Sequence, residues 1–361
     1  MAHGQRPASS YIPSVRTSTQ AAAPAAPSSP RRSRLRRWLS GFLILLLVVG
    51  GAYAGLLWWM TGQLQLAVEN WAGRQRLQGM QVDYGPPERG GWPGWAALRL
   101  PGLRLARDGV SWQAESVRLS LRPWQPDRLR VEAEGAQQIA LKGPPMPLRS
   151  TALRADLTLN GTAAPLAGAL NGTGLRLGSP SGPIMLDSLQ ASFDASGATS
   201  TAFTARLRGL AVPGAQALGE RMEEATAQAV LHGSLGDIGP LTRQLAAWRN
   251  AGGRLEVQGM TLRWGAMAAS AAATLALDDS LQPSGAGTLR LANPSHTLDA
   301  LAGAGLVQPR AAGMARQILP LLTRLDAGSS VPVIELPLVL EKQALSAARI
   351  PLLRLPPVAW P

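Results

Sequence analysis

The chain has 361 residues, a hydrophobic content of 46% and a formal net charge of +13. This is enough apolar material for one large domain or two ordinary ones. Because cysteine is absent, disulfides, thiol nucleophiles, iron–sulfur clusters and cysteine-based zinc sites are excluded. Residues 1–37 hold seven arginines and no acid, so about half of the excess charge lies in a short tail. A nucleic-acid partner would need a basic face on the folded part, and none is predicted.

The N-terminal 60 residues predict a tail and a membrane anchor. Residues 1–37 are rich in Ala, Pro and Ser and are predicted to be a disordered cytoplasmic tail. The uncharged segment Trp38–Met60 would extend about 34 Å as a helix, enough to cross a hydrocarbon core of about 30 Å. Trp38 and the pair Trp58–Trp59 are typical of the two membrane interfaces. Since five arginines precede this span, the positive-inside rule places residues after Met60 outside the cytoplasm.

A cleaved signal peptide is the alternative interpretation of this segment. Ala52–Ala54 form an A-x-A pattern, and Arg36–Leu39 resemble part of a twin-arginine signal. The apolar run continues through Trp59, which is longer than a typical signal core. The uncleaved transmembrane helix, residues 38–60, is therefore the favoured interpretation.

Beyond the span, a helical stripe gives way to alternating segments. Leu64, Val68 and Trp71 predict a juxtamembrane amphipathic helix over residues 61–79, ended by Gly79. Apolar residues then alternate with others in several short runs, which is typical of half-buried strands. The clearest runs are residues 128–134, 153–159, 189–195, 203–207 and 334–340. Because helices are absent between most of these runs, an antiparallel sheet is expected rather than a parallel one.

Three later segments have helical spacing. They are about Pro240–Asn250, with Asp237 near its start, a short helix at Thr297–Leu301, and about Gln308–Leu325. The predicted fold class is therefore mainly β: an N-terminal transmembrane helix, followed over residues 80–361 by a large curved antiparallel sheet domain with a few covering helices.

The stretch from Gly252 to Gly285 alternates for more than twenty positions. The parity of its apolar residues changes at Gly259, which predicts a bulge or turn. In residues 267–277, one face is apolar and the other is unusually small and only mildly polar. The small face consists of Ala268, Ser270, Ala272, Thr274 and Ala276. We expect this strand to be covered on both sides; a helix is the favoured cover, and an apolar groove for a lipid or a partner is the alternative.

Groups suited to catalysis are sparse. His3 lies in the tail, while His232 and His296 form no close-spaced ligand pair, and no G-x-S-x-G elbow is present. The carboxylate pair Asp278–Asp279 stands in a turn context, where Asp accepts hydrogen bonds from backbone N–H groups. A second pair is Glu223–Glu224. The sequence predicts no catalytic residue, no cofactor-binding residue and no metal ligand.

A Gly- and Pro-rich segment, Gly85–Trp95, reads as an irregular entry into the sheet. It lacks the lysine and the following Ser or Thr of a phosphate-binding loop. Its tryptophans, Trp92 and Trp95, are predicted to be lid or core residues rather than a stacking platform.

Residues 64–361 resemble a known family, the alphaproteobacterial domain-of-unknown-function family 2125 (DUF2125). The resemblance rests on "ENWAGRQRLQGMQVDY", "WRNAGGRLEVQGMTLRWG", the "LDDSLQPSG" turn and the closing "LPPVAW". Gly94 departs from the family's pattern, which has an aromatic residue after the proline of "GWP". The family has no assigned catalytic residues. Its fold is similar to β-rich, groove-forming envelope proteins of the AsmA-like kind, which implies a link to lipid traffic.

These observations predict a non-enzymatic protein of the bacterial inner membrane, with a cytoplasmic N-terminus and a periplasmic domain. The expected role is cell-envelope maintenance through lipid binding or transfer, with membrane lipid and an acyl-chain ligand as partners. The alternative is an envelope scaffold or adaptor that binds a protein partner. A membrane-bound hydrolase is the less favoured third class.

Overall fold

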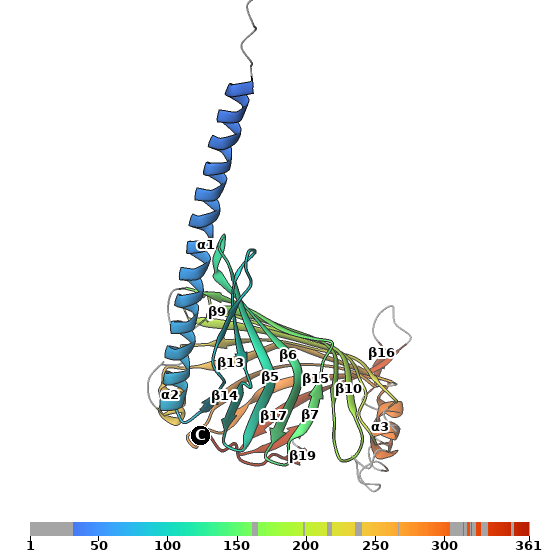
Figure 1. The fold of residues 1–361 in the computed structure, drawn as a ribbon. Helices are drawn as coiled ribbons and strands as arrows, with labels where there is room; N and C mark the ends of the chain where they lie inside the picture. The colour runs from blue at the N-terminus through green and yellow to red at the C-terminus, as the bar shows by residue number, and fades with distance from the viewer. Residues whose placement is uncertain are drawn as a thin grey trace, which may run out of the picture. The chain divides into compact units, whose positions relative to one another are not determined.

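The architecture is that of a long helix followed by one antiparallel sheet, as a computed structural model of the chain shows (Figure 1). The structure describes residues 32–160, 165–197, 199–214, 219–234, 240–265, 267–303, 313, 316–317, 319, 323–325, 331–347 and 350–360. The chain divides into two compact units, Met1–Ala52 and Tyr53–Pro361. The predicted disordered tail falls on residues 1–37, of which 1–31 lie outside the described part; for residues 32–37 the prediction is wrong, because they form the first turns of a helix.

Helix α1, Arg32–Leu77, is continuous through both segments that the sequence analysis treated as span and amphipathic helix. Its described part from Gly41 is long and apolar enough to cross a membrane. The helix ends two residues before Gly79, whose φ of 85° lies in the left-handed region that glycine tolerates best.

The sheet contains nineteen strands among the described residues, and every pair of neighbours is antiparallel, as the sequence predicted. The first nine strands are β1 (Gln81–Asp83), β2 (Glu88–Gly90), β3 (Ala96–Pro101), β4 (Arg104–Arg107), β5 (Val110–Arg122), β6 (Gln125–Leu141), β7 (Met146–Arg149), β8 (Ala152–Leu159) and β9 (Pro165–Leu177). The next six are β10 (Ile184–Asp194), β11 (Ser200–Leu210), β12 (Met222–His232), β13 (Arg254–Trp264), β14 (Met267–Leu277) and β15 (Pro283–Ala292). The last four are β16 (Arg324–Leu325), β17 (Pro332–Glu341), β18 (Ala344–Ala347) and β19 (Ile350–Arg354).

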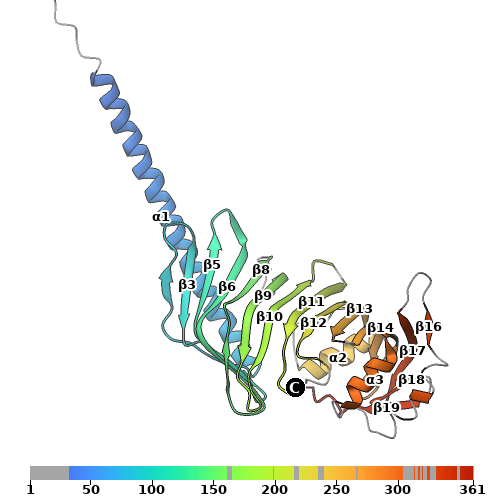
Figure 2. The ribbon, with the colours of Figure 1, turned by 90° about the vertical axis from the view of Figure 1, so that its right-hand side faces the viewer.

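From β8 to β15 the sheet is a simple meander in which each strand pairs with the next along the chain. Figure 2 follows this order from β3 at one side to β19 at the other. The parity change at Gly259 is confirmed as a bulge, because the register shifts there against both β12 and β14.

The main core lies between α1 and the first strands. Leu64, Val68 and Ala72 of the helix are buried against Val82, Leu98 and their neighbours on β1, β3 and β5. A smaller cluster joins Leu57 and Met60 to Ala96. The helix therefore covers one face of the sheet only at its first strands.

Two further helices accompany the later strands. Helix α2, Leu241–Asn250, confirms the prediction for this segment and buries Leu245 and Trp248. Helix α3, Pro294–Gly303, confirms the short helix around Thr297 and contacts β14 and β17. Asp237 lies outside the described residues.

The third predicted helix, about Gln308–Leu325, is wrong at its end. Arg324 and Leu325 form strand β16 and pair with Val333 and Pro332. The described residues 313, 316, 317 and 319 are helical, and the rest of the segment lies outside the described part. Amphipathic spacing at Leu325 could not reveal this pairing, because the partner strand lies further along the chain.

Candidate functional site

The strand register gathers apolar side chains on one face of the sheet. Residues directly opposite each other in antiparallel strands project to the same face. One row crosses β8–β12 through Leu157, Gly168, Phe193, Phe203 and Ala229. A second row, beside it, consists of Ala155, Leu170, Ala191, Ala205 and Ala227.

Both rows continue into the later strands. Met260 of β13 pairs with Ala227, and the row then passes through Ala271, Leu289 and Leu336. The other row passes through Val257, Ala273, Gly287 and Leu338. We call this continuous surface, from β8 to β17, the apolar face.

The opposite face is hydrophilic and held together by cross-strand pairs. Charged contacts join Arg130 to Asp156 at 2.8 Å and Arg154 to Glu132 at 2.7 Å. Hydroxyl pairs follow further along, Ser192 with Thr204 at 2.7 Å and Thr226 with Thr261 at 2.6 Å. These polar side chains can all be solvated, so this face needs no cover. We call it the polar face.

Glu224 is the most connected acid of the polar face. Its carboxylate lies 3.0 Å from Arg208, 3.3 Å from Arg206 and 3.5 Å from Arg263. The hydrogen bond from Arg208 holds the pKa of Glu224 below its ordinary value, and the other two arginines lower it further. On β6, the hydrogen bond to Asp156 raises the pKa of the Arg130 guanidinium. These ion pairs favour the charged forms and link neighbouring strands.

The small surface predicted as a possible groove lies on the polar face, which corrects the sequence interpretation. Ser270 pairs with Thr261 and Arg290, and Thr274 pairs with Glu256. The prediction that this strand is covered on both faces is also wrong. No residue of β14 is buried, and Thr274 and Ala276 are exposed. Alanine and serine fit either environment, so their neighbours decide which side meets water.

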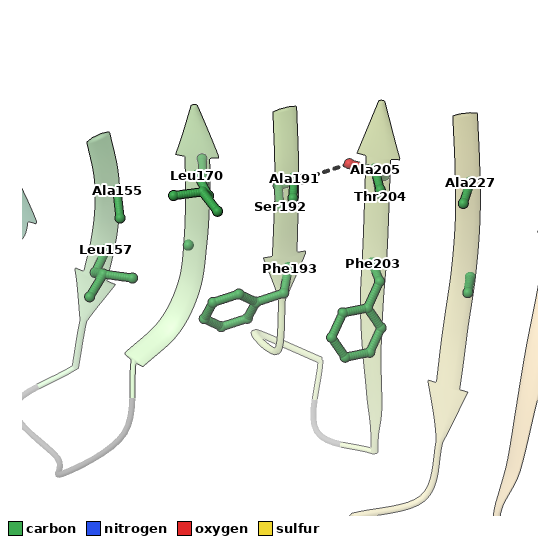
Figure 3. Close-up of a pocket in the computed structure, with 13 residues that line it drawn as sticks. Ala155, Leu157, Leu170, Ala191, Ser192, Phe193, Phe203, Thr204, Ala205 and Ala227 are labelled. Atoms are coloured by element: carbon green, nitrogen blue, oxygen red, sulfur yellow. Dashed lines mark hydrogen bonds between the residues drawn. The ribbon is translucent and has the colours of Figure 1, made fainter. Parts of the chain in front are cut away.

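The apolar face is open over β8–β11. None of the described apolar side chains of β8–β11 or β13–β15 is buried, whereas several of β3 and β5 are, and so are Ile334 and Leu340 at the β17 end of the face. Phe203 is 41% exposed and Met260 is 48% exposed. A hollow of about 350 Å³ lies over β8–β12 between Leu157, Leu170, Phe193 and Phe203 (Figure 3). Its volume is within the range of small-molecule pockets.

A glycine shapes the floor of this hollow. A Cβ at Gly168 would lie 2.5 Å from Phe193 Cε1 and 2.8 Å from Leu157 Cδ2. Figure 3 shows the Phe193 ring and the Leu157 side chain pointing toward each other across β9. Without a side chain at position 168, both groups can lie against the backbone and leave space above them.

Most of the groups considered for chemistry have structural partners. His232 lies 3.0 Å from Glu256 on the polar face, and His296 is exposed on α3. Asp278 confirms the turn prediction, because its Oδ1 accepts hydrogen bonds from the backbone N–H groups of Ser280 and Gln282. In the described part of the chain, no three His, Asp or Glu side chains gather as metal ligands.

Glu223 also serves the backbone: its carboxylate accepts a hydrogen bond from Gly265 N–H. The prediction for the tryptophans of the Gly91–Trp95 loop is wrong in part. Trp92 is 73% exposed and Trp95 is 44% exposed, so neither is a core residue. The loop turns back on itself through hydrogen bonds to Gly91 O, which leaves the indole rings outside.

The motifs that carried the family resemblance are contact points between distant segments. Trp248 Nε1 donates to His232 O at 2.8 Å, and Trp264 Nε1 donates to Gly219 O at 3.0 Å. The side-chain amide of Gln282 donates to Val358 O and accepts from Val358 N–H. These contacts fix strand ends and the C-terminal segment. They give the residues of these motifs a structural role.

The class of protein is defined by two features. It has an antiparallel sheet with one apolar and one polar face, and the sheet follows a helix that is long and apolar enough to span a membrane. The chain belongs to the family DUF2125, described as an uncharacterized protein conserved in bacteria, whose model matches residues 58–356. Neither a curated protein nor a solved structure matches the chain.

Proposed function

We propose that this protein is an anchored, non-enzymatic lipid-handling protein of the bacterial cell envelope, in which the apolar face holds acyl chains. The observation that carries the proposal is the open apolar face itself. Soluble surfaces rarely leave large apolar patches exposed, and such patches usually bind a protein, a membrane or a ligand. Here the patch is continuous over many strands and includes a hollow between Phe193 and Phe203.

Several features favour an acyl chain as the occupant. The two rows of the apolar face carry only hydrocarbon, aromatic and thioether side chains from Leu157 to Leu338, with no charged group to pair with a polar ligand. Its residues are mostly small between β9 and β14, so a thin flexible chain fits the surface better than a bulky rigid partner. The proposal is in line with the analogy to AsmA-like groove proteins that the family resemblance implies.

Placement in the membrane is the second part of the proposal. The helix α1 meets the length and hydropathy requirements of a span. The arginines before Trp38 support a cytoplasmic N-terminus, which would put the sheet in the periplasm of an alphaproteobacterial or similar envelope. A lipid-binding sheet tethered to its source bilayer could load without a free diffusional search.

Photo-crosslinking tests the proposal. The full chain would be reconstituted in vesicles that contain a phospholipid with a diazirine on its acyl chain, irradiated and digested. We expect labelled peptides from β8–β12 in addition to those from α1. Phe203→Asp should reduce the sheet labelling at least several-fold, because a carboxylate in the hollow must be desolvated by an acyl chain.

Thr226→Asp is the matched control, since Thr226 of β12 lies on the polar face beside Thr261 and does not line the hollow. It should leave the labelling unchanged. Labelling confined to α1, or equal loss in both variants, would refute acyl binding on the apolar face. A stoichiometric protein that protects the face from labelling would instead support the adaptor alternative.

A further inference from the structure

We propose that the loop Gly91–Trp95 and the tip of the β5–β6 hairpin dock into the headgroup layer of the bilayer that α1 crosses. We call these two segments the tryptophan end of the sheet. The partner is the polar–apolar boundary of a phospholipid bilayer. The inference rests on the anchoring part of the proposed function and is independent of acyl binding by the apolar face.

Exposed indole rings mark this end. Trp92 of the loop is 73% exposed, and Trp124 at the hairpin tip is 63% exposed. On the neighbouring helix, Trp58 and Trp59 are exposed as well. Such rings are costly in water but favourable at a bilayer interface, where the ring is partly desolvated and the N–H still finds a partner.

Contacts within the unit Tyr53–Pro361 hold the loop and the hairpin tip at the same height along helix α1. Tyr53 Oη donates a hydrogen bond of 3.4 Å to Gly94 O. Leu57 and Met60 are buried against Ala96, which follows the loop, and Leu121, which precedes the hairpin tip, packs on the same cluster. The loop and the hairpin are therefore fixed beside the helix segment that contains Trp58 and Trp59.

Helix length sets the depth of this level. A hydrocarbon core of about 30 Å requires about 20 helical residues. Counted from Trp38, those residues end at Leu57. Tyr53 lies four residues earlier, or about 6 Å inside the boundary. Because Gly94 is bonded to Tyr53, the loop cannot remain in bulk water when the helix spans the core.

Cationic groups at the same end suit lipid phosphates. The Arg89 guanidinium lies 5.6 Å from the centroid of the Trp58 ring. Arg122 and Arg128, on either side of the hairpin tip, are exposed, and none of the described ion pairs includes them. Arginine beside interfacial tryptophan is a combination that anchors protein to headgroups.

Site-directed spin labelling of the full chain in vesicles of phosphatidylethanolamine and phosphatidylglycerol tests the inference. Because the chain has no cysteine, single substitutions place each label. Trp92→Cys and Trp124→Cys are the test positions. Leu141→Cys is the matched control, since Leu141 is 55% exposed at the opposite end of β6, about 50 Å from Trp124. Phe42→Cys, within α1, reports on anchoring itself.

We measure the collision rates of each label with oxygen, which concentrates in lipid, and with a water-soluble nickel complex. Labels at 92 and 124 should collide with the nickel complex at least threefold less often than the label at 141. All three replaced residues are exposed, so the fold should tolerate the labels; unchanged far-ultraviolet circular dichroism is required of each variant.

Equal nickel accessibility at 92, 124 and 141, with Phe42→Cys shielded, would overturn docking of the tryptophan end and leave the anchor intact. A water-accessible label at position 42 would overturn docking and anchoring together. Neither result bears on photo-labelling of β8–β12, so failure of the acyl-binding proposal remains distinguishable.

Discussion

Removal of the Gln282 side-chain amide should release the C-terminal segment from the sheet. Gln282 is only 7% exposed. Its Nε2 donates to Val358 O at 3.1 Å, and its Oε1 accepts from Val358 N–H at 2.7 Å. The amide thus pairs with the backbone N–H and C=O of one residue 76 positions away in the sequence, in the same manner as a neighbouring strand would.

The magnitude follows from these two hydrogen bonds. Each contributes about 1 kcal/mol net, and because Val358 is 39% exposed, water can satisfy the groups that lose their partner. Gln282→Ala should therefore lower the local stability of residues 355–360 by about 2 kcal/mol. Since 1.4 kcal/mol corresponds to a factor of ten, amide exchange at Val358 should accelerate roughly 30-fold.

Hydrogen–deuterium exchange, followed by mass spectrometry of C-terminal peptides, measures this effect directly. Trp360 Nε1 still donates to Leu281 O at 2.7 Å, so the segment should open locally rather than the domain unfold. Gln258→Ala, at an exposed position of β13, is the control and should leave the same peptides unchanged. Unaltered exchange around Val358 in Gln282→Ala would show that the segment is held by other contacts and would refute the reasoning.

Three further outcomes are expected. Trp248→Phe should destabilise the domain by about 1–3 kcal/mol in denaturant unfolding, because the hydrogen bond to His232 O is lost and the smaller ring leaves a gap against Gly253. Glu224→Gln should be less stable than the parent at neutral pH. Since the folded-state pKa of Glu224 is lowered, its stabilisation is present above the ordinary value, about 4, and disappears as pH falls through the lowered one; the gap between the two melting curves should close in acid. Gly91→Ala should cost more than about 1 kcal/mol, since φ is 90° and a Cβ would meet the backbone of the same loop. Gly90→Ala meets no atom within 4 Å and should have a smaller effect in the same thermal melt.

The elements of this fold follow from local patterns in the sequence. The run after Trp38 predicts a long helix, because an uncharged, mostly apolar segment of this length is typical of a membrane span. Alternation in residues 128–134 and 189–195 predicts strands within β6 and β10. The parity change at Gly259 predicts the bulge of β13, and Asp278 predicts the turn between β14 and β15. Each signal is contained within a few neighbouring residues.

The register of the strands decided what those patterns could not. Residues 267–277 carry small side chains on both faces, so hydrophobicity alone does not identify the inner side. Pairing with Met260 and Leu289 assigns Ala271 to the apolar face, whereas pairing with Thr261 and Arg290 assigns Ser270 to the polar one. For this reason the sequence analysis could not assign the small face to the polar side, and offered it as a covered face or, alternatively, as an apolar groove.

Contacts between distant segments were likewise invisible in the sequence. The exposure of Trp92 depends on how its loop packs beside Tyr53, and the role of Gln282 depends on a peptide near the C-terminus. Local spacing determines which backbone conformation a segment prefers, because neighbouring side chains are fixed by the chain itself. Which side of a strand meets water is a property of the whole sheet: α1 covers the first strands, and the apolar face remains open over β8–β11.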